Sequence, residues 1–154
     1  ASANERAASL ELEIAEAKRR QAEAEKSLLE LQNRLRPRSI SPEQREKLSL
    51  ELRKRLTGSI VIHFPSMDAE AEQFALQIAE VLHENNWEVL DCSPIMRIGG
   101  IVPKGLCIEG RSQTTVMARE LEQSFINSEI EIVRTANPQI ENFLEVRLMV
   151  GVKP

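Results

Sequence analysis

The chain has 154 residues, with 20 basic and 24 acidic side chains and a formal net charge of −4 at pH 7. The acidic excess lies in residues 41–154, because residues 1–40 hold eight of the basic and only seven of the acidic groups. An acidic globular part with four Phe, one Trp and no Tyr has neither the basic face nor the stacking surface that general nucleic-acid binding needs.

Cysteine content and hydropathy exclude two further classes. Cys92 and Cys107 fall in apolar runs and are predicted to be buried free thiols, not a disulfide framework or a zinc site. No run reaches the roughly 18 apolar residues of a membrane span, and no signal peptide is visible. The chain begins at Ala1, without Met and already inside a repeating pattern, so we expect a fragment of a longer protein.

A heptad repeat occupies the first 35 residues, with steps that alternate between four and three. A stripe this narrow is buried only against another helix, so residues 1–35 are predicted to form a coiled-coil arm. The heptad begins at Ala3, and we assign oligomerisation to the seam that it forms from Ala7 onward. Its residues are Ala7, Leu10, Ile14, Ala17, Gln21, Ala24, Leu28, Leu31 and Leu35.

The charges beside the seam favour parallel chains. The a positions of the heptad are Ala7, Ile14, Gln21, Leu28 and Leu35. In a parallel pair the g residue of one helix faces the e residue five positions on in its partner. The predicted pairs are Arg6–Glu11, Glu13–Lys18, Arg20–Glu25 and Ser27–Gln32. Three are oppositely charged and none is repulsive, so they select orientation although each contributes only about 0.3–0.5 kcal/mol. The competing interpretation is a solvated helix on its own domain. A dimer is our first choice, but the four alanines of the heptad, Ala3 and the three in the seam, leave trimers and tetramers open.

The seam ends before Pro37, and residues 36–41 are predicted to be a hinge because a residue before proline avoids helical geometry. Its arginines, with Arg34, are expected to be solvated. Ser41 and Gln44 then form a capping box with Pro42 at the first helical position, which predicts a helix over 42–56. This helix leads an α/β domain that spans residues 42–154.

Apolar periodicity predicts the remaining elements. The expected strands cover residues 59–64, 87–92, 105–109, 130–135 and 144–152, and the expected helices cover 67–86 and 112–128. The strand at 59–64 is continuously apolar and is expected to be covered on both faces.

Two β-α-β units, over residues 58–92 and 105–135, precede the final strand. We expect an α/β fold with a five-stranded, mostly parallel sheet and the last strand at an edge. The alternative is a ferredoxin-like split β-α-β sheet, in which the second and third strands form a hairpin.

No constellation for catalysis is present. His63 and His83 lack metal-ligand spacing and are expected to be structural, and no nucleophile elbow, Walker or dinucleotide motif occurs. The sequence therefore predicts no enzyme, no cofactor and no metal.

One stretch has the composition of an anion site. The start of the helix at 112–128 offers free backbone N–H groups, hydroxyls and an arginine, which suit a phosphate or carboxylate. The competing interpretation is simple N-capping by Ser112. The candidate ligand-binding residues are Arg97, Arg111, Ser112, Thr114 and Thr115.

Five short motifs in residues 41–154 stand in a characteristic order. They are Ser41-Pro42-Glu43-Gln44, Asp68-Ala69-Glu70-Ala71-Glu72, Asn86-Trp87, Pro103-Lys104-Gly105-Leu106 and Val150-Gly151-Val152-Lys153-Pro154. With these motifs, residues 41–154 resemble the C-terminal module of uncharacterised bacterial membrane-anchored coiled-coil proteins. The resemblance implies transmembrane helices before the coil, a soluble module after it and no known activity. We expect the module to lie on the cytoplasmic side of the membrane.

We therefore expect a non-enzymatic oligomerising and interaction module, with α/β domains paired by a parallel coiled coil. The expected partners are a second copy of the chain and another protein, with membrane contact only through a segment outside residues 1–154. The alternative is a sensor that binds a small anion near Arg111.

Overall fold

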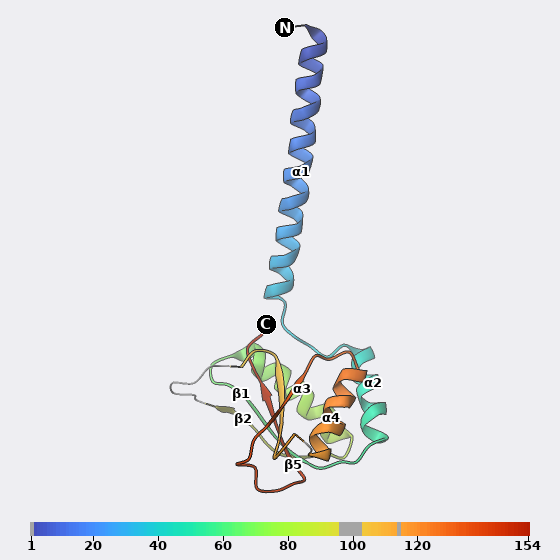
Figure 1. Cartoon of the computed structure of the whole chain (residues 1–154), viewed down its shortest axis with the longest axis vertical. Helices are drawn as coiled ribbons and strands as arrows, with labels where there is room; N and C mark the ends of the chain where they lie inside the picture. The colour runs from blue at the N-terminus through green and yellow to red at the C-terminus, as the bar shows by residue number, and fades with distance from the viewer. Residues whose placement is uncertain (1, 96–102, 114) are drawn as a thin grey trace. The chain divides into compact units, whose positions relative to one another are not determined.

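The computed structural model describes residues 2–95, 103–113 and 115–154 (Figure 1). The chain divides into two compact units, Ala1–Pro37 and Arg38–Pro154. This division falls inside the predicted hinge at 36–41. Arg97 and Thr114, two of the predicted ligand-binding residues, lie outside the described residues.

The first unit is a single helix, α1 (Ala3–Leu35), of 33 residues. Its start is a capping box, in which the Ser2 hydroxyl accepts the Glu5 N–H at 3.3 Å and the Glu5 carboxylate accepts the Ser2 N–H at 3.1 Å. Its end follows from Pro37, because Arg36 takes the extended geometry, with φ −66° and ψ 125°, that proline favours in the residue before it.

The second unit contains three helices and five strands within the described residues. The helices are α2 (Pro42–Arg53), α3 (Ala69–Glu84) and α4 (Val116–Asn127). The strands are β1 (Ser59–Pro65), β2 (Glu88–Ile95), β3 (Leu106–Gly110), β4 (Val133–Ala136) and β5 (Glu145–Val150). The capping box predicted for Ser41 and Gln44 is present at the start of α2.

The strands form one sheet in the order β2-β1-β5-β3-β4. The predicted α/β fold with a mostly parallel five-stranded sheet is confirmed, because β1 runs parallel to β2 and β5 and β3 runs parallel to β4. The expected edge position of the last strand is wrong. Each β-α-β unit keeps its own two strands adjacent, and β5 joins the units by pairing with β1 and, antiparallel, with β3. The ferredoxin-like alternative does not form, since β2 and β3 are not neighbours.

One face of the sheet carries the core. Helix α3 packs on β1 and β2, α4 packs on β3 and β4, and α2 packs against α3 and α4 (Figure 1). Leu48 and Leu52 of α2 are almost completely buried, and each contributes about 1.5–3 kcal/mol by that burial. The strand side chains beneath the helices are Ile60, Ile62, Phe64, Leu106, Ile108, Val146, Leu148 and Val150.

The opposite face of the sheet is less covered than predicted. Val61 and His63 alternate with the buried residues of β1 and are only half-buried. The expectation that residues 59–64 are covered on both faces is therefore wrong for the described part of the chain. In the part of the chain that the structure describes, three helices lie on one side of the sheet, which gives two layers and leaves the other sheet face open.

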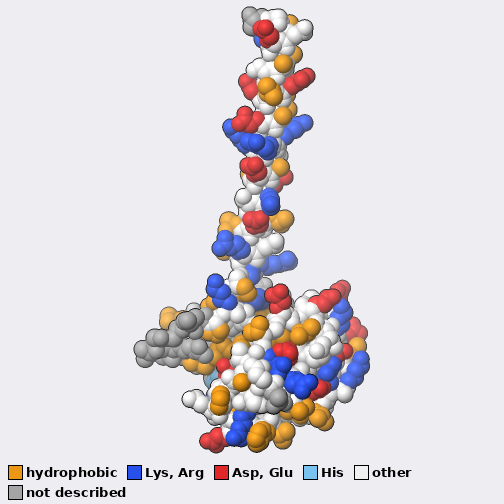
Figure 2. All heavy atoms as spheres, in the orientation of Figure 1, with side chains coloured by type: hydrophobic (Ala, Val, Ile, Leu, Met, Phe, Trp, Pro, Cys, Tyr) orange, Lys and Arg blue, Asp and Glu red, His pale blue; other side chains and the backbone are white. Residues whose placement is uncertain are grey.

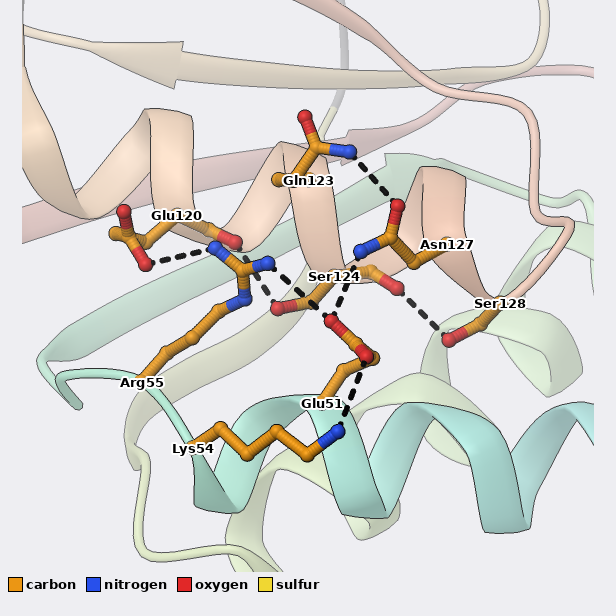
Figure 3. Close-up of polar contacts among 8 residues, drawn as sticks. All are labelled: Glu51, Lys54, Arg55, Glu120, Gln123, Ser124, Asn127 and Ser128. Carbon is orange, nitrogen blue, oxygen red and sulfur yellow. Dashed lines mark hydrogen bonds and ion pairs between the residues drawn. The ribbon is translucent and has the colours of Figure 1, made fainter.

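A polar cluster joins the end of α2 to α4 (Figure 3). Arg55 donates to Glu120 at 2.9 Å and to Glu51 at 3.2 Å, and Asn127 donates to the same Glu51 oxygen at 2.9 Å. The hydrogen bond from Asn127, together with Arg55 and Lys54, lowers the pKa of the Glu51 carboxyl despite partial burial. These bonds orient α4 over α2 above the apolar contact between them.

Gly110 provides a first test of this packing, because it ends β3 directly under the start of α4. A Cβ at this position would lie 2.8 Å from the Cβ of Thr115 and 2.9 Å from that of Ala118. Since atoms cannot approach so closely, we expect Gly110→Ala to lower the free energy of unfolding by about 1–3 kcal/mol in chemical denaturation. Ala136→Ser, at the paired and exposed position of β4, is the control and should change it by less than about 0.5 kcal/mol.

Candidate functional site

The seam of α1 is the most extended apolar surface of the first unit. No residue of α1 is buried, and the large seam residues Leu10, Ile14, Leu28, Leu31 and Leu35 are all more than half exposed. Figure 2 shows acidic and basic side chains distributed along the helix, with hydrophobic atoms between them. A contiguous stripe of this kind marks an association surface.

A second, lighter stripe was missed in the sequence, although its period is also seven. It occupies the b positions of the heptad, separated from the seam by the charged e positions. Its members are Ala8, Ala15, Ala22 and Leu29. A helix with two such stripes can contact two neighbours, which bears on the number of chains in the assembly.

Two of the charges predicted to pair between chains, Arg20 and Glu25, have partners within α1. Arg20 reaches Glu16 at 2.5 Å, and Gln21 donates to Glu25 at 3.2 Å. These contacts are one turn apart and solvent-exposed, so each contributes only about 0.3–0.5 kcal/mol. They are weak enough to be exchanged for contacts with a second helix.

The predicted anion site is built differently from the expectation. Helix α4 begins at Val116, four residues later than predicted, and Ser112 does not cap it. The Thr115 hydroxyl instead accepts the Ser112 N–H at 3.0 Å, and the Thr115 N–H donates to the Ser112 carbonyl at 3.2 Å. This closed turn over Gly110 is the reason for the late start, because Thr115 is held inward and is 6% exposed.

Arg111 is held by another segment. Its guanidinium donates to the Glu141 carbonyl at 3.1 Å and lies over the ring of Phe143, 4.3 Å from the centroid. The structure therefore brings Ser112 and Thr115 together and binds Arg111 to residues 141–143. The first turn of α4 has no acidic side chain, and Thr115 makes no side-chain hydrogen bond to it.

The open face of the sheet is the surface that sequence reasoning missed. Strand register places two rows of side chains across all five strands. The first row is Asp91, Val61, Arg147, Glu109 and Thr135, and the second is Ser93, His63, Met149, Cys107 and Val133. The available signal was the sequence of residues 144–150, in which apolar residues alternate with Glu145, Arg147 and Met149, as in a strand with one lightly covered face. This face is mixed in polarity, with acids around one arginine.

His63 lies on this face and is half-buried, not a core histidine. Its Nδ1 is 3.5 Å from the Ser93 hydroxyl, which donates to the Asp91 carboxylate at 2.8 Å. A serine that gives its proton to a carboxylate is not activated by the imidazole, so these three residues are not arranged as a nucleophile and its base. His83 is exposed in the last turn of α3.

The cysteines are free, as predicted, but half-buried. Burial raises the pKa of the Cys92 thiol, with smaller contributions from Asp91 and Glu72. Cys107 lies on the open face, with its sulfur 3.4 Å from the Thr135 hydroxyl.

Arg38 contradicts the expectation of a solvated hinge. Its Nε and Nη2 donate to the two carboxylate oxygens of Glu70 at 2.7 and 2.8 Å, and Nη2 also donates to the Gly151 carbonyl at 2.7 Å. The guanidinium lies 4.9 Å from the ring centroid of Phe74. The bonds from Arg38 lower the pKa of the Glu70 carboxyl, although burial opposes this. The start of the domain is thus attached to α3 and to the end of β5.

Within the described residues there is no group of three or more His, Cys, Asp or Glu side chains suited to a metal ion. None of the described helices combines the length and apolarity required to cross a bilayer. Comparisons with protein-family models, with curated proteins and with solved structures found no match.

Proposed function

We propose that this chain is a non-enzymatic oligomerising and interaction module, in which a parallel coiled coil formed by α1 displays α/β domains side by side. The observation that carries the proposal is the seam of α1, whose five large aliphatic residues, between Leu10 and Leu35, are all more than half exposed. Helices in water draw most of their stability from the packing of an apolar face, which α1 lacks alone.

The energies support association. Each chain brings five large aliphatic side chains to the seam, and each contributes about 1.5–3 kcal/mol when buried. Association costs about 4–15 kcal/mol in lost freedom of motion, so the seam of two chains is sufficient to exceed it. The polar seam residue Gln21 favours a single register at some loss of stability.

A dimer is the proposed state, and the second stripe at Ala8, Ala15, Ala22 and Leu29 is the feature that would support a trimer or tetramer. We further propose, from the resemblance of residues 41–154 alone, that the parent protein is anchored in a membrane and carries this module on the cytoplasmic side.

The mass of the full chain in solution tests assembly. Sedimentation equilibrium at micromolar concentration should give twice the chain mass of 17.4 kDa. A monomer mass at these concentrations would contradict the proposal.

Orientation needs a separate measurement. Ala3→Cys, at the first position of the heptad seam and in a Cys92→Ala and Cys107→Ala background, should form a disulfide-linked dimer on mild oxidation if the chains are parallel. In antiparallel chains the two Ala3 positions would lie about 50 Å apart along a 33-residue helix, beyond disulfide reach. Absence of the crosslink in an assembled protein would contradict the parallel arrangement.

The second candidate is a sensor of small anions at the start of α4. The favouring observation is the first turn of this helix, which has neither an acidic residue nor a side-chain cap. If this candidate is correct, inorganic phosphate or a nucleotide raises the melting temperature of the full chain and Arg111→Ala removes the effect. An unchanged melting temperature at millimolar ligand would reject it.

A further inference from the structure

We propose that the free edge of β4, with the apolar depression beside it, binds an extended segment of a partner protein that combines an apolar side chain with Lys or Arg. This inference rests on the interaction half of the proposed function and names the surface and the partner chemistry. The segment would join the sheet as an additional strand, a common mode of peptide recognition.

The two edges of the sheet differ in their protection. Edge strands expose unpaired backbone groups, which proteins block with prolines, bulges and charges. Strand β2 has all three, since Pro94 has no N–H, Leu90 is the extra residue at a register shift opposite Ile60 and Val61, and Asp91 is exposed.

Strand β4 has neither a proline nor a bulge in Val133–Ala136, and the charge of Arg134 is paired with Glu122 at 3.2 Å. Within the described residues, its one strand neighbour is β3. The N–H of Asn137 donates to the Gly110 carbonyl at 2.7 Å, so odd-numbered residues of this segment face β3. Because successive residues alternate, the N–H and C=O groups of Arg134 and Ala136 point to the free side.

An open depression of about 530 Å³ adjoins the beginning of β4. Its residues are Ile126, Glu129, Ile130, Glu131, Ile132 and Val133. Val133 is shared by the depression and the strand, and it is 59% exposed. A side chain of an added strand can therefore enter the depression while its backbone pairs with Arg134 and Ala136.

Charge decides the chemistry of the partner. Exposed Glu129 and Glu131 flank the apolar side chains, and Lys47, at 3.6 Å from Glu129, offsets one of them. Residues 41–154 as a whole carry 12 basic and 17 acidic groups, which leaves an acidic surface. Complementarity favours a basic segment over an acidic one and over a second copy of this acidic domain.

The backbone at this depression is also strained. Glu129 has φ 62°, a left-handed conformation that glycine or asparagine adopts at lower cost after a helix end. It follows the C-cap Ser128 of α4, and the N–H of Ile130 donates to the Phe125 carbonyl at 3.0 Å across it. Asn86 has a similar conformation after α3, with φ 68°, so this geometry ends a helix, and here it brings an acidic side chain to the rim of the depression.

The test is selection from a random peptide library displayed on phage, with the full chain as bait. We expect enrichment of peptides that alternate apolar residues with Lys or Arg. Ala136→Pro removes one N–H from the free edge and keeps the bonds to β3, so it should weaken an enriched peptide about tenfold. Glu131→Lys should weaken it several-fold, more at low salt than at high salt. Thr135→Ala, whose N–H faces β3, is the matched control and should bind as the unchanged chain does.

Amide hydrogen exchange gives an independent readout. The bound peptide should protect the N–H groups of Arg134 and Ala136 in the unchanged chain, and far-UV circular dichroism should show that Ala136→Pro remains folded.

The proposal is overturned if no peptide is enriched, if enriched peptides bind Ala136→Pro equally well, or if these amides are unaffected. It is also overturned if Ala136→Pro lowers the mass measured by sedimentation equilibrium, because that result would mean that the β4 edge of the unchanged chain pairs with a second copy. A monomeric full chain that still binds such peptides would reject the coiled-coil proposal and leave this one standing.

Discussion

Leu28→Lys is expected to disassemble the protein. Leu28 occupies an a position of the seam, so a dimer buries it in both chains at once. Replacing a buried leucine costs about 2–5 kcal/mol for each copy, and two copies raise the dissociation constant by about a thousandfold or more. Sedimentation equilibrium should show a monomer at concentrations where the unchanged chain is dimeric, and the helical signal of circular dichroism should fall because α1 loses its packing.

Leu29→Lys is the matched control, since the two leucines are adjacent and almost equally exposed in the single chain, at 56% and 58%. They differ only in heptad position, a for Leu28 and b for Leu29. In a dimer through the seam, Leu29→Lys should remain assembled. Equal loss of assembly in both variants would contradict the seam assignment, and it would indicate that the b stripe is also buried, as in a larger bundle.

Features that depend on neighbouring residues were predictable from the sequence. The end of α1 before Pro37 and the Ser41–Gln44 capping box are interactions within four residues, and both are present. The order of strands and helices also followed from local periodicity. The mostly parallel α/β sheet predicted from that order is confirmed by the observed topology.

Features that depend on distant residues were not predictable. The central position of β5 results from pairing with β1, more than 80 positions earlier, and with β3, and nothing in its own alternation distinguishes a central strand from an edge strand. The prediction of where α4 begins was wrong for a related reason. Serine is a residue type that often caps helices, but Ser112 instead donates its N–H to the hydroxyl of Thr115, which is held inward over Gly110. The helix therefore begins only at Val116.

Arg38 shows how far such a contact can change the interpretation of a residue. The sequence places it in a short segment with other arginines, which is typical of a solvated hinge. Its partners are instead distant in sequence, with Glu70 32 residues away and Gly151 113 residues away. Its side chain is 13% exposed and that of Glu70 is 23% exposed.

Arg38→Ala should therefore destabilise the domain strongly, by about 3–5 kcal/mol, because it leaves the Glu70 carboxylate partly buried without its bidentate partner. Thermal and chemical denaturation would measure this loss. Arg34→Ala, which removes an exposed arginine of α1, should change the domain transition by less than about 0.5 kcal/mol. A similar small effect of both variants would show that the pair contributes little.

The pH dependence distinguishes the ion pair from lost packing against Phe74. Arg38 lowers the pKa of Glu70 in the folded chain, so the pair stabilises above the ordinary carboxyl pKa of about 4.3. This contribution is lost as the pH falls through the lowered pKa, where Glu70 becomes protonated. The unchanged chain should thus lose stability on acidification more steeply than Arg38→Ala, and the two curves should converge at low pH. Parallel curves would mean that Arg38 acts through its contact with the Phe74 ring and through the Gly151 carbonyl, neither of which titrates with Glu70.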